Sequence, residues 1–455
     1  MADDRVVIVG AGPAGVRAAE VLAAPGIRPV VIDENPAPGG QIYRQPPAGF
    51  QRGYRELYGI EAGKARRLHR TFAELAETVD YRPSTLAWNV YDKILYVVRD
   101  GVHDRIPFDA LILAPGAADL VLPFPGWTNP GVYTLGGAQI ALKHQGCAVG
   151  RETIFLGTGP LLYLVAYQYA KAGAKVAAVL DTSPLEDRLR ALPGLIIGGL
   201  ALAKGVYYMG WLKSKGIPLL SGVRPLRVEG DGRIEALVCR DSQRRDFAVA
   251  GDAVAFGFGL RSECQLADLA RCEFYFDERL RQWLPKADED GSTTTDGVYI
   301  AGDGRRVAGA EAAESAGALA AFAVLIDRGY PVTLGTHRFW RARVTALDGF
   351  RKGLEEAFPP PLTLARAASD DTVVCRCENV SAGTLRAAAR DLGATEINRA
   401  KALTRLGMGR CQGRYCALAA AEILAEALDL PVEDVGRLRA QAPVKPLGLA
   451  EAQEP

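Results

Sequence analysis

Four cysteines stand close together in the C-terminal part of the chain, as Cys375-Arg-Cys377 and Cys411-Gln-Gly-Arg-Tyr-Cys416. Four thiolates satisfy either a tetrahedral Zn²⁺ ion or a [2Fe–2S] cluster. Zinc sites usually separate the cysteines of a pair by about two to four residues, so a single intervening residue is unusual for zinc. Gly407 and Gly409 suit a loop that wraps closely around a cluster. We therefore expect all four cysteines to ligate a [2Fe–2S] cluster. The alternative is four buried structural cysteines.

The charge around these cysteines supports a cluster. Between positions 375 and 416 there are eight Lys and Arg residues but only three Asp and Glu residues. A local positive excess would offset the negative charge of a thiolate-ligated cluster and tune its potential.

A second chemical motif lies near the N-terminus, where Gly10-Ala-Gly12-Pro13-Ala14-Gly15 joins an apolar strand to a helix. Gly10 permits a tight turn, Gly12 lets backbone N–H groups approach a pyrophosphate, and Gly15 allows close packing of helix on strand. Asp33 follows the next strand and is placed to bind ribose hydroxyls, with Glu34 as the competing residue. The motif predicts a dinucleotide site.

Three further segments indicate which dinucleotide binds. Gly39-Gly40-Gln41 supplies more backbone donors. The segment Leu111–Gly116, with Ala114 and Gly116, resembles the strand and turn by which two-domain flavoprotein reductases cross between domains. The segment Val298–Asp303, with Gly302 and Asp303, resembles the strand whose terminal Asp holds the ribityl chain of FAD. Over about 330 residues the chain thus resembles the pyridine-nucleotide-disulfide-reductase type of FAD fold. No redox cysteine pair stands in this region, so dithiol chemistry is not expected.

A second glycine turn, Gly157-Thr-Gly159, lacks the third glycine and has Leu162 in its place. Asp181, after the next strand, would favour an unphosphorylated ribose. Two interpretations stay open. This unit either binds an adenine nucleotide such as NAD, or it is an ancestral NAD domain retained as a scaffold.

The elements that must position these motifs follow from hydrophobic patterning, and they predict an α/β fold with two Rossmann-like domains plus a small helical domain. Expected strands cover 5–9, 29–32, 154–156, 175–180, 253–256 and 298–301, and expected helices cover 13–24, 160–172, 381–390, 396–404 and 417–427. The predicted organisation is an FAD-binding domain at 1–150, a degenerate NAD-type domain at 151–260, a return to the FAD domain at 261–335, a helix and Pro-rich linker at 336–371, the [2Fe–2S] domain at 372–430 and a tail at 431–455. We expect the linker to keep the cluster domain separate from the flavin domain.

Composition excludes several classes of protein. Of the 455 residues, 49% are hydrophobic and 24% are charged, and the net charge is +1, which argues against a nucleic-acid binder. No apolar run reaches the roughly 18 residues that a membrane span needs. The first strand follows Arg5 directly and leaves no room for a signal peptide, so we expect a cytoplasmic protein. It could reach the inner membrane through its electron acceptor. No histidine stands beside a nucleophile or in metal-ligand spacing, so no catalytic residue is assigned.

The C-terminal cysteine pattern resembles the bacterioferritin-associated-ferredoxin-like (BFD-like) [2Fe–2S] domain. The whole chain resembles the α subunit of bacterial hetero-oligomeric, dye-linked amino- and imino-acid dehydrogenases, among them opine oxidases, D-hydroxyproline dehydrogenase and L-proline dehydrogenase. A cyanide synthase subunit is closely similar. The resemblance implies a D-amino-acid-oxidase-like β subunit that holds the substrate, an FMN at the subunit interface, and a small ferredoxin-like γ subunit in some complexes. The α subunit would then transfer electrons to an external acceptor.

Two other functions stay open. The chain could be a self-contained NADH-dependent reductase that loads FAD through its second domain. It could also be a redox or iron sensor, with the flavin domain as its scaffold.

Overall fold

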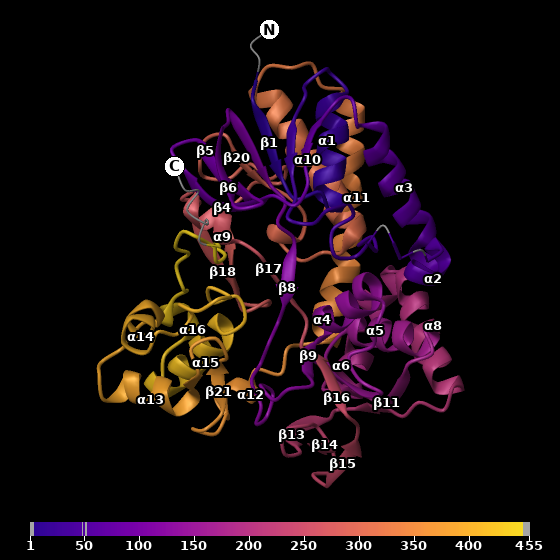
Figure 1. Ribbon diagram of the computed structural model, residues 1–455, viewed down its shortest axis with the longest axis vertical. Helices are drawn as coiled ribbons and strands as arrows, with labels where there is room; N and C mark the ends of the chain where they lie inside the picture. Colours follow the sequence, from indigo (N-terminus) through magenta and orange to yellow (C-terminus); the bar gives the residue numbers. More distant parts are fainter. Residues whose placement is uncertain (1–3, 48, 51, 449–455) are drawn as a thin grey trace, which may run out of the picture.

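The computed structural model describes residues 4–47, 49–50 and 52–448. Figure 1 shows three parts: a flavin-type domain at the top, a second Rossmann-like domain at the lower right and a small helical module at the lower left. None of the helices in the described part of the chain is long and apolar enough to cross a membrane. The predicted fold class is confirmed.

The first domain is built on a five-stranded parallel sheet in the order β20-β7-β1-β2-β3. Its strands are β1 (Val6–Val9), β2 (Val30–Ile32), β3 (Asp80–Arg82), β7 (Ala110–Leu113) and β20 (Val298–Ile300). Strand β20 joins the sheet through its pairing with β7, so the chain returns to its first domain as the sequence predicted.

The two faces of this sheet carry different layers. Alternate residues such as Ile8 and Ile112 pack against helices, and their neighbours such as Val7 and Leu111 pack against a small antiparallel sheet. The helices are α1 (Pro13–Ala23), α2 (Tyr54–Tyr58), α3 (Ala62–Glu74) and α10 (Ala310–Asp327), with a 3₁₀ turn η1 (Gly59–Glu61), and the small sheet has β4 (Leu86–Tyr91), β5 (Ile94–Arg99) and β6 (Val102–Pro107). Because both faces are covered, the central strands are continuous Val, Ile and Leu runs.

The second domain has another five-stranded parallel sheet, in the order β12-β11-β10-β16-β9. Its strands are β9 (Val132–Thr134), β10 (Glu152–Gly157), β11 (Lys175–Asp181), β12 (Leu219–Ser221) and β16 (Ala253–Gly257). A separate antiparallel sheet contains β13 (Arg224–Glu229), β14 (Ala236–Arg240) and β15 (Asp246–Ala250). Its helical elements are α4 (Leu135–Ile140), a π-helical turn η2 (Ala141–Gln145), α5 (Pro160–Lys171), α6 (Leu185–Arg190), α7 (Leu192–Ile197) and α8 (Leu200–Ser214).

Two antiparallel strands connect the domains at the centre of Figure 1, namely β8 (Ala117–Asp119) and β17 (Leu260–Ser262). The chain then forms α9 (Gln265–Leu269), β18 (Phe274–Asp277), β19 (Gln282–Pro285), the 3₁₀ turn η3 (Gly302–Gly304) and the long helix α11 (Leu334–Ala357).

The C-terminal module contains α12 (Thr363–Arg366), β21 (Val373–Cys375), β22 (Val380–Ser381), α13 (Ala382–Arg390), α14 (Ile397–Thr404), α15 (Ala417–Leu428) and α16 (Val432–Val435). Its core is continuous with that of the second domain, where Trp127 and Phe256 lie. The Trp127 indole N–H donates to the Val373 carbonyl at 2.6 Å.

The expectation of a separating linker is therefore wrong. Leu364 and Ala365 of the Pro-rich segment are buried in the shared core, because their apolar side chains pack there instead of remaining in water. Part of the segment expected to be a tail also packs, since Val444 lies in the core of the flavin-type domain and its N–H donates to the Trp88 carbonyl at 3.1 Å. Residues 449–455 of that segment lie outside the described residues.

Candidate cofactor sites

The first glycine turn is held by contacts that leave no room for side chains at two of its glycines. Gly10 has φ +106°, and a Cβ there would lie 2.3 Å from the Ala114 carbonyl oxygen at the end of β7. A Cβ on Gly15 would lie 1.7 Å from the Gly10 carbonyl oxygen. These glycines therefore bring β1, β7 and α1 together as the motif requires.

Gly12 and Gly40 form the open side of the turn. A Cβ on Gly12 would meet only the Gly40 Cα, at 3.6 Å. Helix α1 begins at Pro13, its N-cap is Gly12, and no side chain caps it. The first backbone N–H groups of a helix that lacks a capping side chain are free to bind an anion. This cradle fits the pyrophosphate of a dinucleotide. Ala14 follows Pro13 in α1 and packs closely on Gly302, where an added Cβ would lie 2.9 Å from the Ala14 Cβ.

The two acidic residues after β2 already have protein partners. Asp33 is buried, and its carboxylate accepts the N–H of Ala11 at 2.6 Å and the N–H of Asn35 at 2.7 Å. Burial raises the pKa of Asp33. The Glu34 carboxylate is ion-paired with Lys445. Asp33 thus fixes the glycine turn, and a ribose contact for either residue stays a prediction.

The other predicted flavin residues gather around the same end of the sheet. The Asp303 carboxylate accepts the N–H groups of Ala308 at 2.8 Å and Gly309 at 3.2 Å, just before α10 begins. Burial raises the pKa of Asp303. Gly116 has φ +78° at the start of the crossover, and exposed Gln41 accepts a hydrogen bond from Arg44 at 2.8 Å.

The second glycine turn is not an equivalent site. Gly157 is needed, because a Cβ would lie 1.9 Å from the Gly257 carbonyl oxygen, and Gly159 has φ +96°. The Asp181 side chain, however, is fully buried. It accepts the Tyr163 hydroxyl at 2.7 Å and the Ser183 N–H at 2.7 Å, and it pairs with Arg188 of α6 at 2.6 Å. Leu162 is also fully buried. The carboxylate that would bind a ribose is thus already engaged by other side chains and a backbone N–H group. This favours the interpretation that the second domain is a scaffold.

The four C-terminal cysteines come together in one loop region. The Cys416 thiol is hydrogen-bonded to Cys375 and Cys411, and Cys377 is hydrogen-bonded to Cys411. In the described part of the chain, no group of three or more His, Cys, Asp or Glu side chains is arranged to hold a metal ion. These hydrogen bonds link the four thiols in the order Cys375, Cys416, Cys411 and Cys377. A [2Fe–2S] cluster takes four thiolates on two irons, and four neighbouring cysteines supply that number of ligands.

Hydrogen bonds favour the thiolate at two of the four cysteines, Cys375 and Cys411, whereas burial raises the pKa of Cys377 and the hydrogen bonds to Cys375 and Cys411 raise that of Cys416. The pKa of Cys375 is lowered to about 6, first by the hydrogen bond from Cys416 and then by backbone N–H groups of the loop. The pKa of Cys411 is lowered to about 5, again first by Cys416. A Cβ on Gly409 would lie 2.4 Å from the Cys377 Cβ, so only glycine lets these loops approach. Thiolates that accept backbone hydrogen bonds are what a cluster site requires.

The cluster loop docks directly on the flavin-type domain, which sequence reasoning did not anticipate. Arg414 lies between two of the cysteines and pairs with Glu263 at 2.6 Å. Gln265 donates to the Gln412 carbonyl at 2.6 Å. Between Glu263 and Gln265, the Cys264 thiol donates to the carbonyl of Gly304, the neighbour of Asp303, at 3.3 Å. The segment 263–265 thus contacts both predicted cofactor loops.

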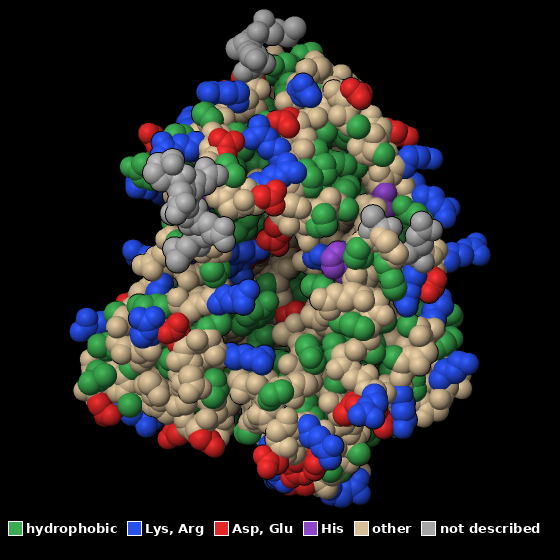
Figure 2. Space-filling view, in the orientation of Figure 1, with side chains coloured by type: hydrophobic (Ala, Val, Ile, Leu, Met, Phe, Trp, Pro, Cys, Tyr) green, Lys and Arg blue, Asp and Glu red, His purple; other side chains and the backbone are tan. Residues whose placement is uncertain are grey.

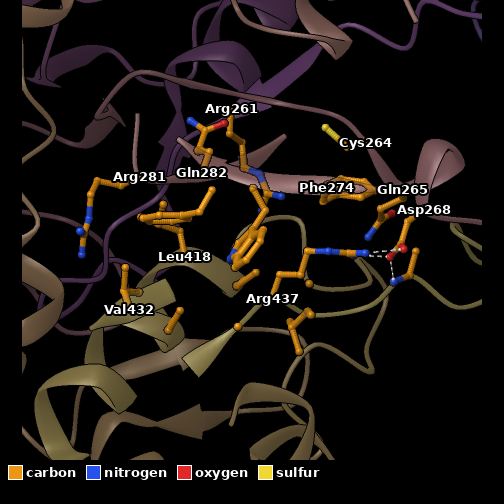
Figure 3. Close-up of a pocket in the computed structure, with 18 of the residues that line it drawn as sticks. Arg261, Cys264, Gln265, Asp268, Phe274, Arg281, Gln282, Leu418, Val432 and Arg437 are labelled. Atoms are coloured by element: carbon orange, nitrogen blue, oxygen red, sulfur yellow. Dashed lines mark hydrogen bonds and ion pairs between the residues drawn. The ribbon is translucent and has the colours of Figure 1, made fainter. Parts of the chain in front are cut away.

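A pocket lies beside this contact (Figure 3), where Arg437 reaches across from the C-terminal segment to Asp268 of α9 at 2.6 Å. On the module's helix α15, the buried carboxylate of Glu422 binds Arg281 at 2.9 Å and Arg366 at 2.7 Å. No motif marks these partners, because they lie 56 to 169 positions apart in sequence. In the sequence, only their charged side chains could have suggested that they form ion pairs. Figure 2 shows the hollow between the module and the other two parts, with Lys and Arg side chains at its edges.

Comparisons with known proteins agree with this geometry. Residues 4–317 match the family model described as pyridine nucleotide-disulphide oxidoreductase, and residues 373–426 match the BFD-like [2Fe-2S] binding domain. These matches define an oxidoreductase of the flavoprotein class, and they imply FAD in the first part and a [2Fe–2S] cluster in the second. The predicted family resemblance is confirmed.

The relatives narrow the class further. The A subunit of opine oxidase from Agrobacterium tumefaciens (strain Ach5) is 35% identical, over 98% of this chain and 90% of that protein. The hydrogen cyanide synthase subunit HcnB of Pseudomonas aeruginosa is 32% identical, over 99% and 98%. The chain belongs to the family of opine oxidase A subunits. The crystal structure of L-proline dehydrogenase from P. horikoshii has the same fold, with a TM-score of 0.72 and 21% identity over 98% of this chain and 78% of that one.

Proposed function

We propose that this chain is the electron-transferring subunit of a heteromeric dehydrogenase that oxidises an amino or imino acid of the opine, hydroxyproline or proline class. The relatives named as A subunits support a complex, and the names opine oxidase and proline dehydrogenase support this substrate class. In the proposed complex a D-amino-acid-oxidase-like β subunit holds the substrate, with an FMN at its interface with this chain. A ferredoxin-like γ subunit is a further candidate component, and the complex is cytoplasmic.

The observation that carries the proposal is the segment 263–265, which contacts both predicted cofactor loops. The cluster loop touches residues 263–265, and Cys264 touches the carbonyl of Gly304 beside Asp303. Flavin accepts an electron pair as a hydride and a [2Fe–2S] cluster handles one electron at a time, so together they connect a two-electron donor to a one-electron acceptor. The residues of this chain hold the two loops in fixed proximity.

A self-contained NADH-dependent reductase is less well supported. Such an enzyme needs a ribose-binding carboxylate on its second domain, and Asp181 is already engaged by Tyr163, Ser183 and Arg188. Opening that site would break a buried ion pair, at a cost of about 3–5 kcal/mol.

The test compares the purified chain with the complex co-expressed with the β subunit. We expect the complex, and not the isolated chain, to reduce a dye with an imino acid as donor. Anaerobic NADH should leave the flavin of the isolated chain oxidised. Rapid bleaching of the flavin by NADH, or dye reduction by the isolated chain at the rate of the complex, would overturn the proposal.

A further inference from the structure

The second domain carries an apolar surface on α6, α7 and α8. Of the 21 large hydrophobic side chains exposed among the described residues, eight lie within positions 185–207. Ile196 is 63% exposed, Ile197 is 64% exposed and Leu200 is 82% exposed. Val206 and Tyr207 continue the surface along α8. We call residues 185–207 with these exposed side chains the α6–α8 surface.

Two of the three helices that present this surface, α7 and α8, are anchored by buried side chains. Leu195 of α7 lies in a small core with Ala357 of α11. On α8, Tyr208 and Leu212 are buried against the second domain and Leu200 is largely exposed. The half-exposed Tyr207 ring lies edge-on to Tyr167 of α5, at 5.9 Å between ring centroids. The surface is therefore a fixed feature of the fold, and its apolar side chains face solvent in this chain alone.

The surface extends to the flavin-type domain. Lys204 of α8 is ion-paired with Glu61 of η1. The neighbour of Glu61 in sequence, Ile60, is 49% exposed. A partner seated on α8 would therefore also reach the flavin-type domain.

The size of the surface indicates a protein interface. At these exposures the eight side chains present on the order of 900 Å², close to the roughly 800 Å² that each partner contributes to a standard interface.

The charges argue against a lipid surface as the occupant. A helix that binds anionic membranes needs free Lys and Arg around its apolar face. Here Arg188 pairs with Asp181, Arg190 with Asp187 and Lys204 with Glu61. The three cations within residues 185–207 are thus ion-paired within the chain, whereas Lys213 in the last turn of α8 is in none of these pairs. The pairing favours an apolar protein face as the occupant.

We propose that the α6–α8 surface is the docking site for the substrate-bearing β subunit, which would present a complementary apolar face low in charge. This inference rests on the proposed function, since it takes the partner from there. It adds the location of the interface, which neither the cofactor motifs nor the names of the relatives provide.

The test uses the full chain co-expressed with the β subunit. Leu200→Glu places a charge at the most exposed position of the surface, and we expect it to weaken assembly at least tenfold. Leu334→Glu is the matched control, because Leu334 is 65% exposed at the other end of α11, about 30 Å from the end of that helix that contacts α7. Flavin content and melting temperature of each isolated chain verify that it is folded. Hydrogen–deuterium exchange on the wild-type complex gives a second measurement, in which residues 192–210 should become protected.

The outcomes separate this inference from the proposed function. If the wild-type complex forms but Leu200→Glu assembles normally and 192–210 gain no protection, the β subunit docks elsewhere and only this inference fails. If the wild-type chains form no complex, both fail. Two other results would overturn it by identifying another occupant. One is self-association of the isolated chain that Leu200→Glu abolishes. The other is flotation with phosphatidylethanolamine–phosphatidylglycerol vesicles that Leu200→Glu abolishes.

Discussion

Glu422 is the residue whose removal should most clearly release the cluster module from the rest of the chain. Its side chain is only 1% exposed, and its two oxygens accept four hydrogen bonds, from Arg281 at 2.9 and 3.0 Å and from Arg366 at 2.7 and 2.9 Å. Arg281 belongs to the flavin-type domain and Arg366 to the Pro-rich segment. A Glu422→Leu substitution therefore leaves two cations without a counter-charge at the junction of three segments.

The expected cost follows from the exposure of the arginines. Removing one partner of a buried ion pair costs about 3–5 kcal/mol. Arg281 and Arg366 are 25% and 44% exposed, so both can regain water and the cost falls to about 2–3 kcal/mol. With a denaturant dependence of about 1–3 kcal/mol per M in urea, the midpoint of module unfolding should fall by about 1–3 M urea.

The assay is a urea titration in which visible absorbance reports the cluster and fluorescence reports the flavin. We expect Glu422→Leu to lose its cluster absorbance at lower urea, in a transition separated from that of the flavin. The control is Glu426→Gln on the same helix, because Glu426 is 49% exposed, lies 3.8 Å from Arg386 and should cost at most about 0.5 kcal/mol. The reasoning is refuted if Glu422→Leu and Glu426→Gln lose their cluster absorbance at the same urea concentration.

Three further predictions concern the cofactor sites. Gly12→Ala should fold, because its Cβ meets only one backbone atom, at 3.6 Å, but it should lose FAD, because that Cβ enters the pyrophosphate cradle. Gly15→Ala should instead destabilise the chain, because its Cβ would lie 1.7 Å from the Gly10 carbonyl oxygen. Flavin extraction and thermal melts distinguish the two variants. Cys411→Ser should remove iron and sulfide but leave the flavin content unchanged, and wild-type protein with zinc in place of iron would contradict the cluster. Lys143 is buried with its pKa lowered to about 8, so between pH 8 and 10.5 the unfolded chain binds more protons and wild-type stability rises with pH. The stability of Lys143→Met relative to wild type should therefore fall by roughly 2–3 kcal/mol between pH 7 and pH 10 in urea titrations of flavin-free protein, and an unchanged difference would contradict the buried charge.

The elements that the sequence predicted well share one property: their signals are local. The glycine turn at Gly10, the strand that precedes Asp303 and the helices of the cysteine module each depend on spacings within a few residues, and the structure contains these elements. Asp181 shows where such reasoning stops. Its position after a strand predicts a ribose ligand, but its actual partner, Arg188, arrives on a helix that the motif does not describe.

The docking of the cluster module illustrates the same limit across domains. Pro-rich composition usually indicates a loop or linker. Whether such a segment stays in water depends on whether a distant apolar surface can receive it, and here Leu364 finds the core that contains Trp127 and Phe256. That surface is formed by residues more than 100 positions away, so no local pattern could have predicted it.

The shared core of the module and the second domain also constrains how this family can change during evolution. A domain on a free tether can be gained or lost in one genetic event, because its removal exposes nothing. Here deletion after α11 would strip the cover from Leu120, Trp127 and Phe256 and leave the Trp127 indole without the Val373 carbonyl. We therefore expect a lineage that discards the iron–sulfur module also to replace this apolar surface with polar residues. An ancestral reconstruction should find that loss of the module and polar substitution at these positions occur together.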